Sequence, residues 1–252
     1  MPPTIVLIRH AQALHNDWNI HDPDLSSLGL DQCQELKENL SQRFADETDA
    51  IIIVSPMRRT IQTALLSLDW LIKKGVPIQA DARWQGNKPY NPPAIRDPIY
   101  PNKTLPAGAL YAFNREAILG RGQSGLQNVY ERKEKLVFIV SHSGFLRAGV
   151  TGYWFFNADY RIFEFEKSGT PGKSYQLQQV ESTLSGGLGK SRTEPVVIGS
   201  ELPPASETPP QAWHLRHEKS NVDYDTRQRI HILGVPQACI AAVSTTGNQQ
   251  EA

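Results

Sequence analysis

The sequence predicts an α/β protein, a three-layer sandwich in which helices cover both faces of a mostly parallel sheet. Three apolar runs, at residues 5–8, 50–54 and 136–140, have the length and β-branched content of buried strands. Segments with helical spacing or capping signals separate the runs, and this alternation is typical of a parallel sheet. A titratable or basic segment follows each run, which points to a site at the carboxyl edge of the sheet.

The composition is that of a globular protein without an overall charge. The 252 residues are 39% hydrophobic, enough for a sizeable core, and 26 basic side chains balance 26 acidic ones. A net charge of zero gives no reason to expect nucleic acid or an acidic membrane surface as a partner. Cys33 and Cys239 lie too far apart for a disulfide framework or a zinc motif. Because the first residues lack signal-peptide features and no apolar run could span a bilayer, we expect a cytoplasmic protein.

The first strand, residues 5–8, stops at Arg9 and His10. Ligands of open α/β sheets bind beyond the carboxyl ends of the strands, so this guanidinium and this imidazole should face an anion. A helix that covers the sheet should begin after Ser26 or Ser27, either of which can be its N-cap. Its apolar side chains recur at helical spacing: Leu30, Cys33, Leu36, Leu40 and Phe44.

The second strand, residues 50–54, ends in a basic turn at residues 55–60. The helix that follows should bury one face, which consists of Ile61, Leu65, Leu68 and Ile72. Residues 77–79 are expected to form a short third strand. The order of strand, basic turn and helix therefore occurs twice along the chain.

Residues 84–108 are rich in proline and have no regular period, so we expect a lid or a substrate-binding insertion. Trp84 and Tyr90 either line a substrate cleft or anchor this proline-rich stretch on the core. Residues 110–135 should be helical in parts, with breaks near three glycines, Gly120, Gly122 and Gly125.

The strand at residues 136–140 leads to His142, and a last strand is expected at residues 161–165. From residue 168, Gly, Ser, Pro, Thr and Gln dominate the composition. We therefore expect a domain at residues 1–167 and a partly irregular C-terminal extension at residues 168–252 that packs on the core. The extension either closes the site or builds a homodimer.

Three strands should thus bring two imidazoles and several guanidiniums to one edge of the sheet, without nearby carboxylates. Guanidinium groups match phosphate oxygens bidentately. A neutral imidazole can attack phosphorus and carry the phosphoryl group, while the arginines and the second histidine stabilise the charge. This combination predicts an anion site that is suited to phosphoryl transfer.

Four motifs, in this order, resemble those of the histidine phosphatase superfamily, the phosphoglycerate mutase-like proteins. They are Leu-Ile-Arg-His at residues 7–10 with Asn16 six residues past the histidine, Leu-Ser-x-x-Gly-x-x-Gln at 25–32, Ser-Pro-Met-Arg-Arg-Thr-Ile-Gln-Thr-Ala at 55–64, and Ser-His-Ser-Gly at 141–144. The resemblance covers roughly residues 4 to 167 and implies the histidine-phosphatase fold.

The resemblance also implies roles for individual residues. His10 would be the phosphorylated nucleophile, and Arg9, Arg59 and His142 would hold the phosphoryl oxygens. The residues that we expect to bind the substrate are Asn16, Arg58, Trp84, Tyr90, Asn91 and Ser143.

One position departs from the family pattern. Relatives carry a glutamate after the third strand that serves as general acid, and the matching position here is Gln85. Asn91 falls on a position that is often acidic in fungal-looking relatives. Glutamine cannot supply a proton by ionising, and general acid catalysis is typically worth roughly 10²–10⁴-fold in rate. Asp81 and Asp97 are the alternative acids that the sequence offers.

Three functions remain open. The first is hydrolysis of a small phosphorylated metabolite through phosphohistidine. The second is repurposed acid–base chemistry of His10 and His142 on a carboxylated metabolite, such as the isomerisation, cyclisation or dehydration steps of secondary metabolism. The third is anion binding without catalysis. All three imply a small-molecule phosphate or carboxylate partner, and none implies a metal or an organic cofactor.

Overall fold

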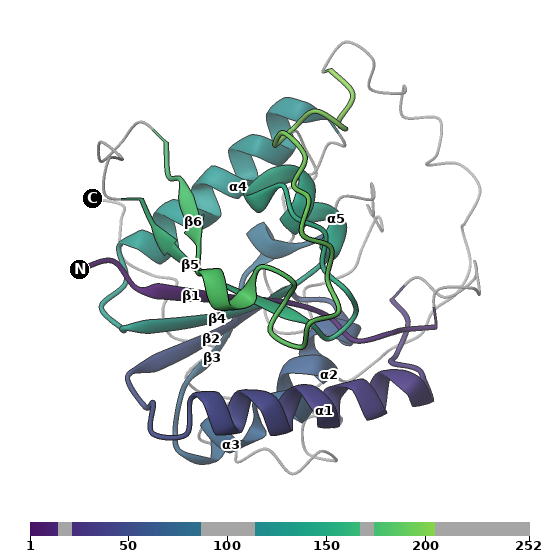
Figure 1. The fold of residues 1–252 in the computed structure, drawn as a ribbon, viewed down its shortest axis with the longest axis vertical. Helices are drawn as coiled ribbons and strands as arrows, with labels where there is room; N and C mark the ends of the chain where they lie inside the picture. Colours follow the sequence, from purple (N-terminus) through teal and green to yellow (C-terminus); the bar gives the residue numbers. More distant parts are fainter. Residues whose placement is uncertain (15–21, 87–113, 167–173, 205–252) are drawn as a thin grey trace, which may run out of the picture.

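The computed structural model describes residues 1–14, 22–86, 114–166 and 174–204, which surround a six-stranded sheet of order β3-β2-β4-β1-β5-β6 (Figure 1). The strands are β1 (Thr4–Arg9), β2 (Ala50–Val54), β3 (Ile78–Ala80), β4 (Leu136–Ser141), β5 (Tyr160–Phe165) and β6 (Leu177–Gln179). Strands β3, β2, β4 and β1 pair in parallel, whereas β5 and β6 are antiparallel to their neighbours. The predicted α/β sandwich with a mostly parallel sheet is confirmed.

Helices cover both faces of this sheet (Figure 1). One face carries α1 (Ser27–Arg43), α2 (Arg58–Ser67) and α3 (Asp69–Lys73), and the other carries α4 (Arg115–Tyr130), α5 (Ser143–Phe145) and the π-helix η3 (Leu146–Thr151). The 3₁₀ turns η1 (Ala82–Trp84) and η4 (Glu181–Thr183) follow β3 and β6. Among the described residues, no helix combines the length and apolar character needed to cross a membrane.

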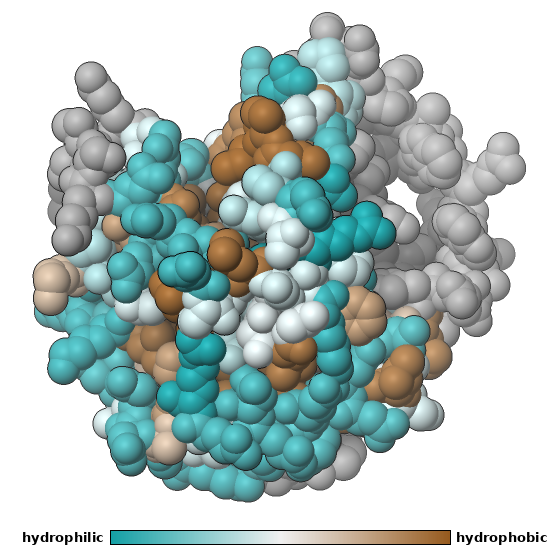
Figure 2. All heavy atoms as spheres, in the orientation of Figure 1, coloured by the Kyte–Doolittle hydropathy of each residue, from teal (hydrophilic) through white to brown (hydrophobic). Residues whose placement is uncertain are grey.

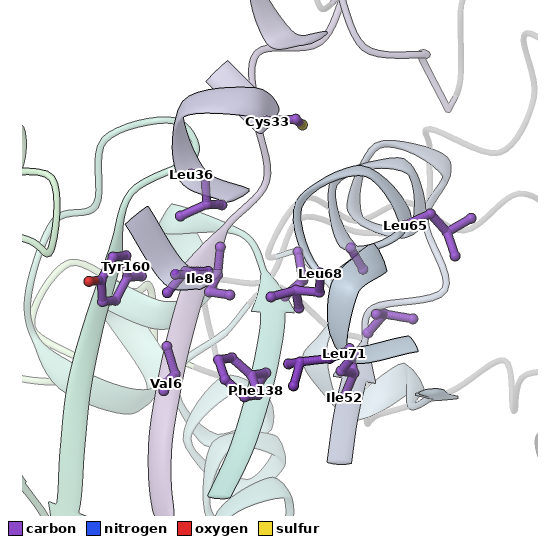
Figure 3. Close-up of a cluster of buried hydrophobic side chains, with 14 of the residues drawn as sticks. Val6, Ile8, Cys33, Leu36, Ile52, Leu65, Leu68, Leu71, Phe138 and Tyr160 are labelled. Carbon is purple, nitrogen blue, oxygen red and sulfur yellow. The ribbon is translucent and has the colours of Figure 1, made fainter. Parts of the chain in front are cut away.

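The alternation of side chains along the strands divides the core into two layers. The layer under α1 to α3 contains Val6, Ile8, Leu36, Ile52, Leu68, Leu71 and Phe138 (Figure 3). The layer under α4 contains Ile5, Leu7, Ile51, Ile53, Val137 and Ile139. Burial of each apolar side chain of this size contributes roughly 1.5–3 kcal/mol to folding relative to leaving it exposed. The two layers therefore hold the central strands, and the residues that follow them, in place.

Helix α1 begins where the capping signal predicts. Ser26 is the N-cap, and its Oγ accepts the backbone N–H of Gly29 at 3.1 Å. The buried face runs through Gly29, Cys33, Leu36 and Leu40. Leu30, one residue around the helix, is 52% exposed, so its predicted place on the apolar face is wrong. The outward face of α1 is largely hydrophilic, as the lower part of Figure 2 shows.

The helix predicted after β2 is two helices, because α2 ends at Ser67 and α3 begins at Asp69. The backbone of Leu68 caps both helices. The four apolar side chains predicted to share a face, Ile61, Leu65, Leu68 and Ile72, are all buried in the layer beneath α1 to α3.

The breaks predicted within residues 110–135 are wrong, since α4 runs without interruption from Arg115 to Tyr130. Two of its glycines allow close packing. A Cβ at Gly122 would lie 2.2 Å from the carbonyl oxygen of Gly149, and a Cβ at Gly125 would lie 3.1 Å from the ring of Trp84. A Cβ at Gly120 would meet open space.

Residues 174–204 pack on the sheet. Strand β6 pairs with β5, and the fully buried Arg161 of β5 donates to the carbonyl oxygen of Leu184 at 2.6 Å and to that of Trp154 at 2.9 Å. The predicted boundary at residue 168, most of the proline-rich stretch (87–108) and the extension beyond residue 204 lie outside the described residues.

Candidate active site

The order of the strands brings the predicted site residues together. Strand β4 lies between β1 and β2, with Arg9 opposite Ser141 and Val54 opposite Val140. The pairing continues one step further, because the N–H of His10 donates to Ser141 O and the N–H of Ser55 donates to Val140 O, both at 3.0 Å. The segments that follow β1, β2 and β4 therefore begin side by side at the carboxyl edge of the sheet.

The imidazole of His10 is buried and has a defined tautomer. Its Nδ1 lies 2.7 Å from the carbonyl oxygen of Ala11, and because a carbonyl only accepts, Nδ1 carries the proton. Its Nε2 therefore has a lone pair and accepts a hydrogen bond from Nε of Arg59 at 3.3 Å. This is the neutral form of histidine that can act as a nucleophile through Nε2.

The second imidazole, that of His142, lies next to the first, with ring centroids 5.1 Å apart and an interplanar angle of 60°. Its Nδ1 lies 3.1 Å from Nη2 of Arg59, and since a guanidinium only donates, Nδ1 accepts. The proton is then on Nε2, which donates to the buried Oγ of Ser55 at 2.9 Å. Arg59 thus contacts both histidines from one guanidinium.

A carboxylate also contacts Arg59, contrary to the expectation that none lies nearby. Oδ1 of Asp22 is 3.5 Å from Nη1 of Arg59, and both oxygens of Asp22 accept the backbone N–H of Arg58 at 3.1 and 2.9 Å. Burial raises the pKa of the Asp22 carboxyl, and the charge of Asp24 acts in the same direction, whereas the N–H of Arg58 and the guanidiniums of Arg59 and Arg58 oppose the shift.

Arg9 adds a second cation, which is half-buried. Its Nη1 donates to the carbonyl oxygen of Phe155 at 2.8 Å, and its guanidinium lies 5.8 Å from the ring centroid of Trp154. Burial, and then the like charge of Arg59, lower the pKa of Arg9 to about 10. Arg9 is still positively charged at neutral pH, so an anion that binds near both guanidiniums would relieve their repulsion.

Two further predicted residues lie around this centre. Oγ of Ser143 accepts the N–H of Phe155 at 3.3 Å. Arg58 directs its Nη2 to Oδ2 of Asp24 at 2.6 Å. The remaining predicted residues, Asn16, Tyr90, Asn91 and Asp97, lie outside the described part of the chain. Within that part, no three His, Cys, Asp or Glu side chains gather as metal ligands would.

Of the two roles expected for Trp84, the structure supports anchoring on the core and not lining a cleft, because its side chain is fully buried and packs edge to face on Phe145. The two residues that follow it approach the site. The carbonyl oxygen of Gln85 accepts Nη1 of Arg121 at 2.7 Å, and a Cβ at Gly86 would lie 3.4 Å from Cγ of His142. The position matched to the family's general acid therefore belongs to a segment that borders His142.

Asp81, one of the two alternative acids from the sequence, is bound by Arg83. Its Oδ1 accepts the backbone N–H and Nε of Arg83, both at 2.9 Å, and its Oδ2 accepts Nη2 of the same arginine at 2.8 Å. These bonds attach Asp81 to the 3₁₀ turn η1. Within the described part of the chain, the hydrogen bonds of this carboxylate run to Arg83 and not to either imidazole of the site.

Several supporting residues were not singled out from the sequence. Thr63 Oγ1 accepts the N–H of Ala11 at 3.0 Å and donates to the carbonyl oxygen of Arg59, which joins the segment after His10 to α2. A Cβ at Gly29 would lie 2.1 Å from the carbonyl oxygen of Gln12, so only glycine lets α1 approach this segment. Thr63 lies one helical turn after Arg59, and this spacing is the signal that the sequence does contain.

Residues 5–86 match the family model of the histidine phosphatase superfamily (branch 1). A phosphoglycerate mutase-like protein from Arabidopsis thaliana is 24% identical over 201 residues, which cover 60% of this chain and 74% of that protein. The resemblance drawn from the motifs is therefore confirmed: the chain carries the histidine phosphatase signature from β1 to the segment that contains Gln85.

Two solved structures are similar to part of this chain. The mycobacterial glucosyl-3-phosphoglycerate phosphatase is 20% identical, with a TM-score of 0.48 over 71% of this chain and 97% of that one. Bacillus stearothermophilus YhfR is 20% identical, with a TM-score of 0.47 over 70% of this chain and 96% of that one.

Proposed function

We propose that this protein hydrolyses a small phosphate monoester through a phosphohistidine intermediate on His10. One observation carries the proposal: the guanidinium of Arg59 contacts Nε2 of His10 and Nδ1 of His142 at the same time. An anion that binds Arg59 must therefore lie against a nucleophilic lone pair. Such placement supplies much of the catalysis in phosphoryl transfer, because the reaction needs mainly positioning and charge stabilisation.

In the first step, Nε2 of His10 forms a bond to phosphorus while the bond to the leaving oxygen breaks. The proton on Nδ1 stays hydrogen-bonded to Ala11 O, which stabilises the positive charge that develops on the ring. Arg59 and Arg9 stabilise the negative charge of the phosphoryl oxygens. Water then attacks phosphorus and returns the electron pair to Nε2.

His142 would stabilise the phosphoryl oxygens together with Arg59 and Arg9. Its Nδ1 accepts from Arg59 in the structure, but a bound dianion favours the protonated imidazole. Protonated Nδ1 can donate to a phosphoryl oxygen, while Nε2–H stays bonded to Ser55. Ser55 thus sets the orientation of the ring before substrate arrives.

The test is turnover of p-nitrophenyl phosphate by the wild type, by His10→Ala and by Gln85→Glu. We expect activity in the wild type and none above background in His10→Ala, with a melting curve to show that the variant is folded. An inactive wild type beside an active Gln85→Glu would instead support repurposed chemistry in an intact phosphate site. Calorimetry that detects no binding of inorganic phosphate would contradict both the hydrolytic function and the non-catalytic one.

A further inference from the structure

The proposed hydrolysis lacks an assigned proton donor for the leaving group. Gln85 stands where relatives carry the acidic residue, and the carboxyl of Asp81 is bound by Arg83. The bridging oxygen of the ester leaves as an alkoxide unless a proton reaches it. Departure as an alkoxide is costly for any poor leaving group. A carboxyl group near the phosphoryl oxygens would solve this problem.

We propose that Asp22 donates the proton to the leaving oxygen, an inference that rests on the proposed function. Among the described residues, the carboxyl of Asp22 forms an ion pair with Arg59, and this guanidinium reaches both imidazoles. One planar group therefore separates the carboxyl from Nε2 of His10. In this proposal an ester that binds across Arg59, with phosphorus against Nε2 of His10, directs its leaving oxygen toward Asp22.

The surroundings of Asp22 suit a carboxyl that exchanges a proton with a ligand. Its side chain is 19% exposed, so it is largely desolvated yet reachable. The charged groups that face it are Arg58 and Arg59 on α2 and Asp24 on its own segment, and desolvation is the largest influence on its pKa, which is raised. Asp24 is different, since it pairs directly with Arg58 and accepts from Gln62.

Substrate binding would itself load the proton. A phosphate ester dianion on Arg59 would place negative charge beside the carboxylate of Asp22. The repulsion between the two negative charges favours the protonated carboxyl. In the first step the protonated carboxyl gives its proton to the leaving oxygen as the P–O bond breaks and the N–P bond forms. In the second step the carboxylate takes a proton from the attacking water, so ester and water become alcohol and phosphate.

The experiment compares the wild type with Asp22→Asn on three esters whose leaving groups become progressively poorer: p-nitrophenyl, phenyl and glycerol phosphate. Asparagine retains an oxygen that can accept the N–H of Arg58, so the start of α2 is preserved. We expect kcat/KM to fall less than tenfold on p-nitrophenyl phosphate and on the order of 10²-fold or more on the other two esters. The matched control, Asp24→Asn, should change all three by the same factor.

A rescue strengthens the test. Introducing Gln85→Glu into the Asp22→Asn protein should restore hydrolysis of phenyl phosphate, because it returns a carboxyl to the segment that borders His142. An equal loss on all three esters would overturn the proposal and show that Asp22 only positions Arg59, while the hydrolysis itself would stand. A wild type that forms no phosphohistidine would overturn both, and mass spectrometry distinguishes this failure from the other.

Discussion

The imidazole rings of His10 and His142 face each other with centroids 5.1 Å apart, and one guanidinium, that of Arg59, donates to both. The two histidines are 132 positions apart in the chain but follow neighbouring strands. Both imidazoles accept a hydrogen bond from this permanent cation, so each has a lone pair on the accepting nitrogen. The two accepting nitrogens are directed to the same guanidinium. An anion at that guanidinium meets two histidines and the buried Arg59, and the half-buried Arg9 is near enough to repel Arg59.

Replacing Arg59 by lysine should weaken phosphate binding roughly 10- to 100-fold, because charged hydrogen bonds are worth about 1.5–3 kcal/mol and a lysine lacks the planar fork that reaches both rings. Isothermal titration calorimetry with inorganic phosphate measures the loss. Arg58→Lys separates the two arginines: its guanidinium pairs with Asp24, so we expect less than roughly a threefold change. Equal losses in both variants would contradict the central place given to Arg59.

Asp22→Asn should gain stability relative to the wild type as the pH rises. Burial raises the folded-state pKa of the Asp22 carboxyl above its ordinary value of 3.8. The wild type therefore loses stability as the pH rises from 3.8 through the folded-state pKa, and the asparagine variant does not. Urea unfolding at a series of pH values gives the free-energy difference, variant minus wild type. It should increase over this window and then stay level; a decrease would refute the stated direction of the shift.

Two glycines of α4 give a matched pair of substitutions. Gly122→Ala should destabilise the protein by roughly 1–3 kcal/mol, because its Cβ would lie 2.2 Å from the carbonyl oxygen of Gly149. Gly120→Ala meets open space and should stabilise the same helix by up to about 1 kcal/mol. Thermal melts of both variants provide the check. Destabilisation by Gly120→Ala would mean that its surroundings are misjudged.

Three of the strands could be predicted with ease because each is an uninterrupted apolar run. Residues 5–8, 50–54 and 136–140 became β1, β2 and β4, and the β-branched side chains alternate between two core layers. The continuity of α4 could not be predicted. Gly122 and Gly125 weaken a helix by local propensity, and only the packing of η3 and Trp84 against them shows why the helix needs them.

The site could be predicted where residue identity alone points to chemistry. His10, Arg59 and His142 follow strand ends, and the parallel order of β1, β4 and β2 brings them together. Asp22 could not be placed in the same way, because it lies in a polar loop and its neighbours in space are on α2, 36 positions further along the chain. The sequence left Trp84 between the core and the substrate site, because an aromatic residue beside a proline-rich stretch has the same local signature in both places.

The most direct measurement is the intact mass of the protein after rapid mixing with p-nitrophenyl phosphate and quenching in alkali, which preserves phosphohistidine. We predict one phosphoryl group per chain, located on His10 by peptide mapping and lost in His10→Ala. An unmodified wild type that still releases nitrophenol, or a phosphoryl group on another residue, would contradict the account.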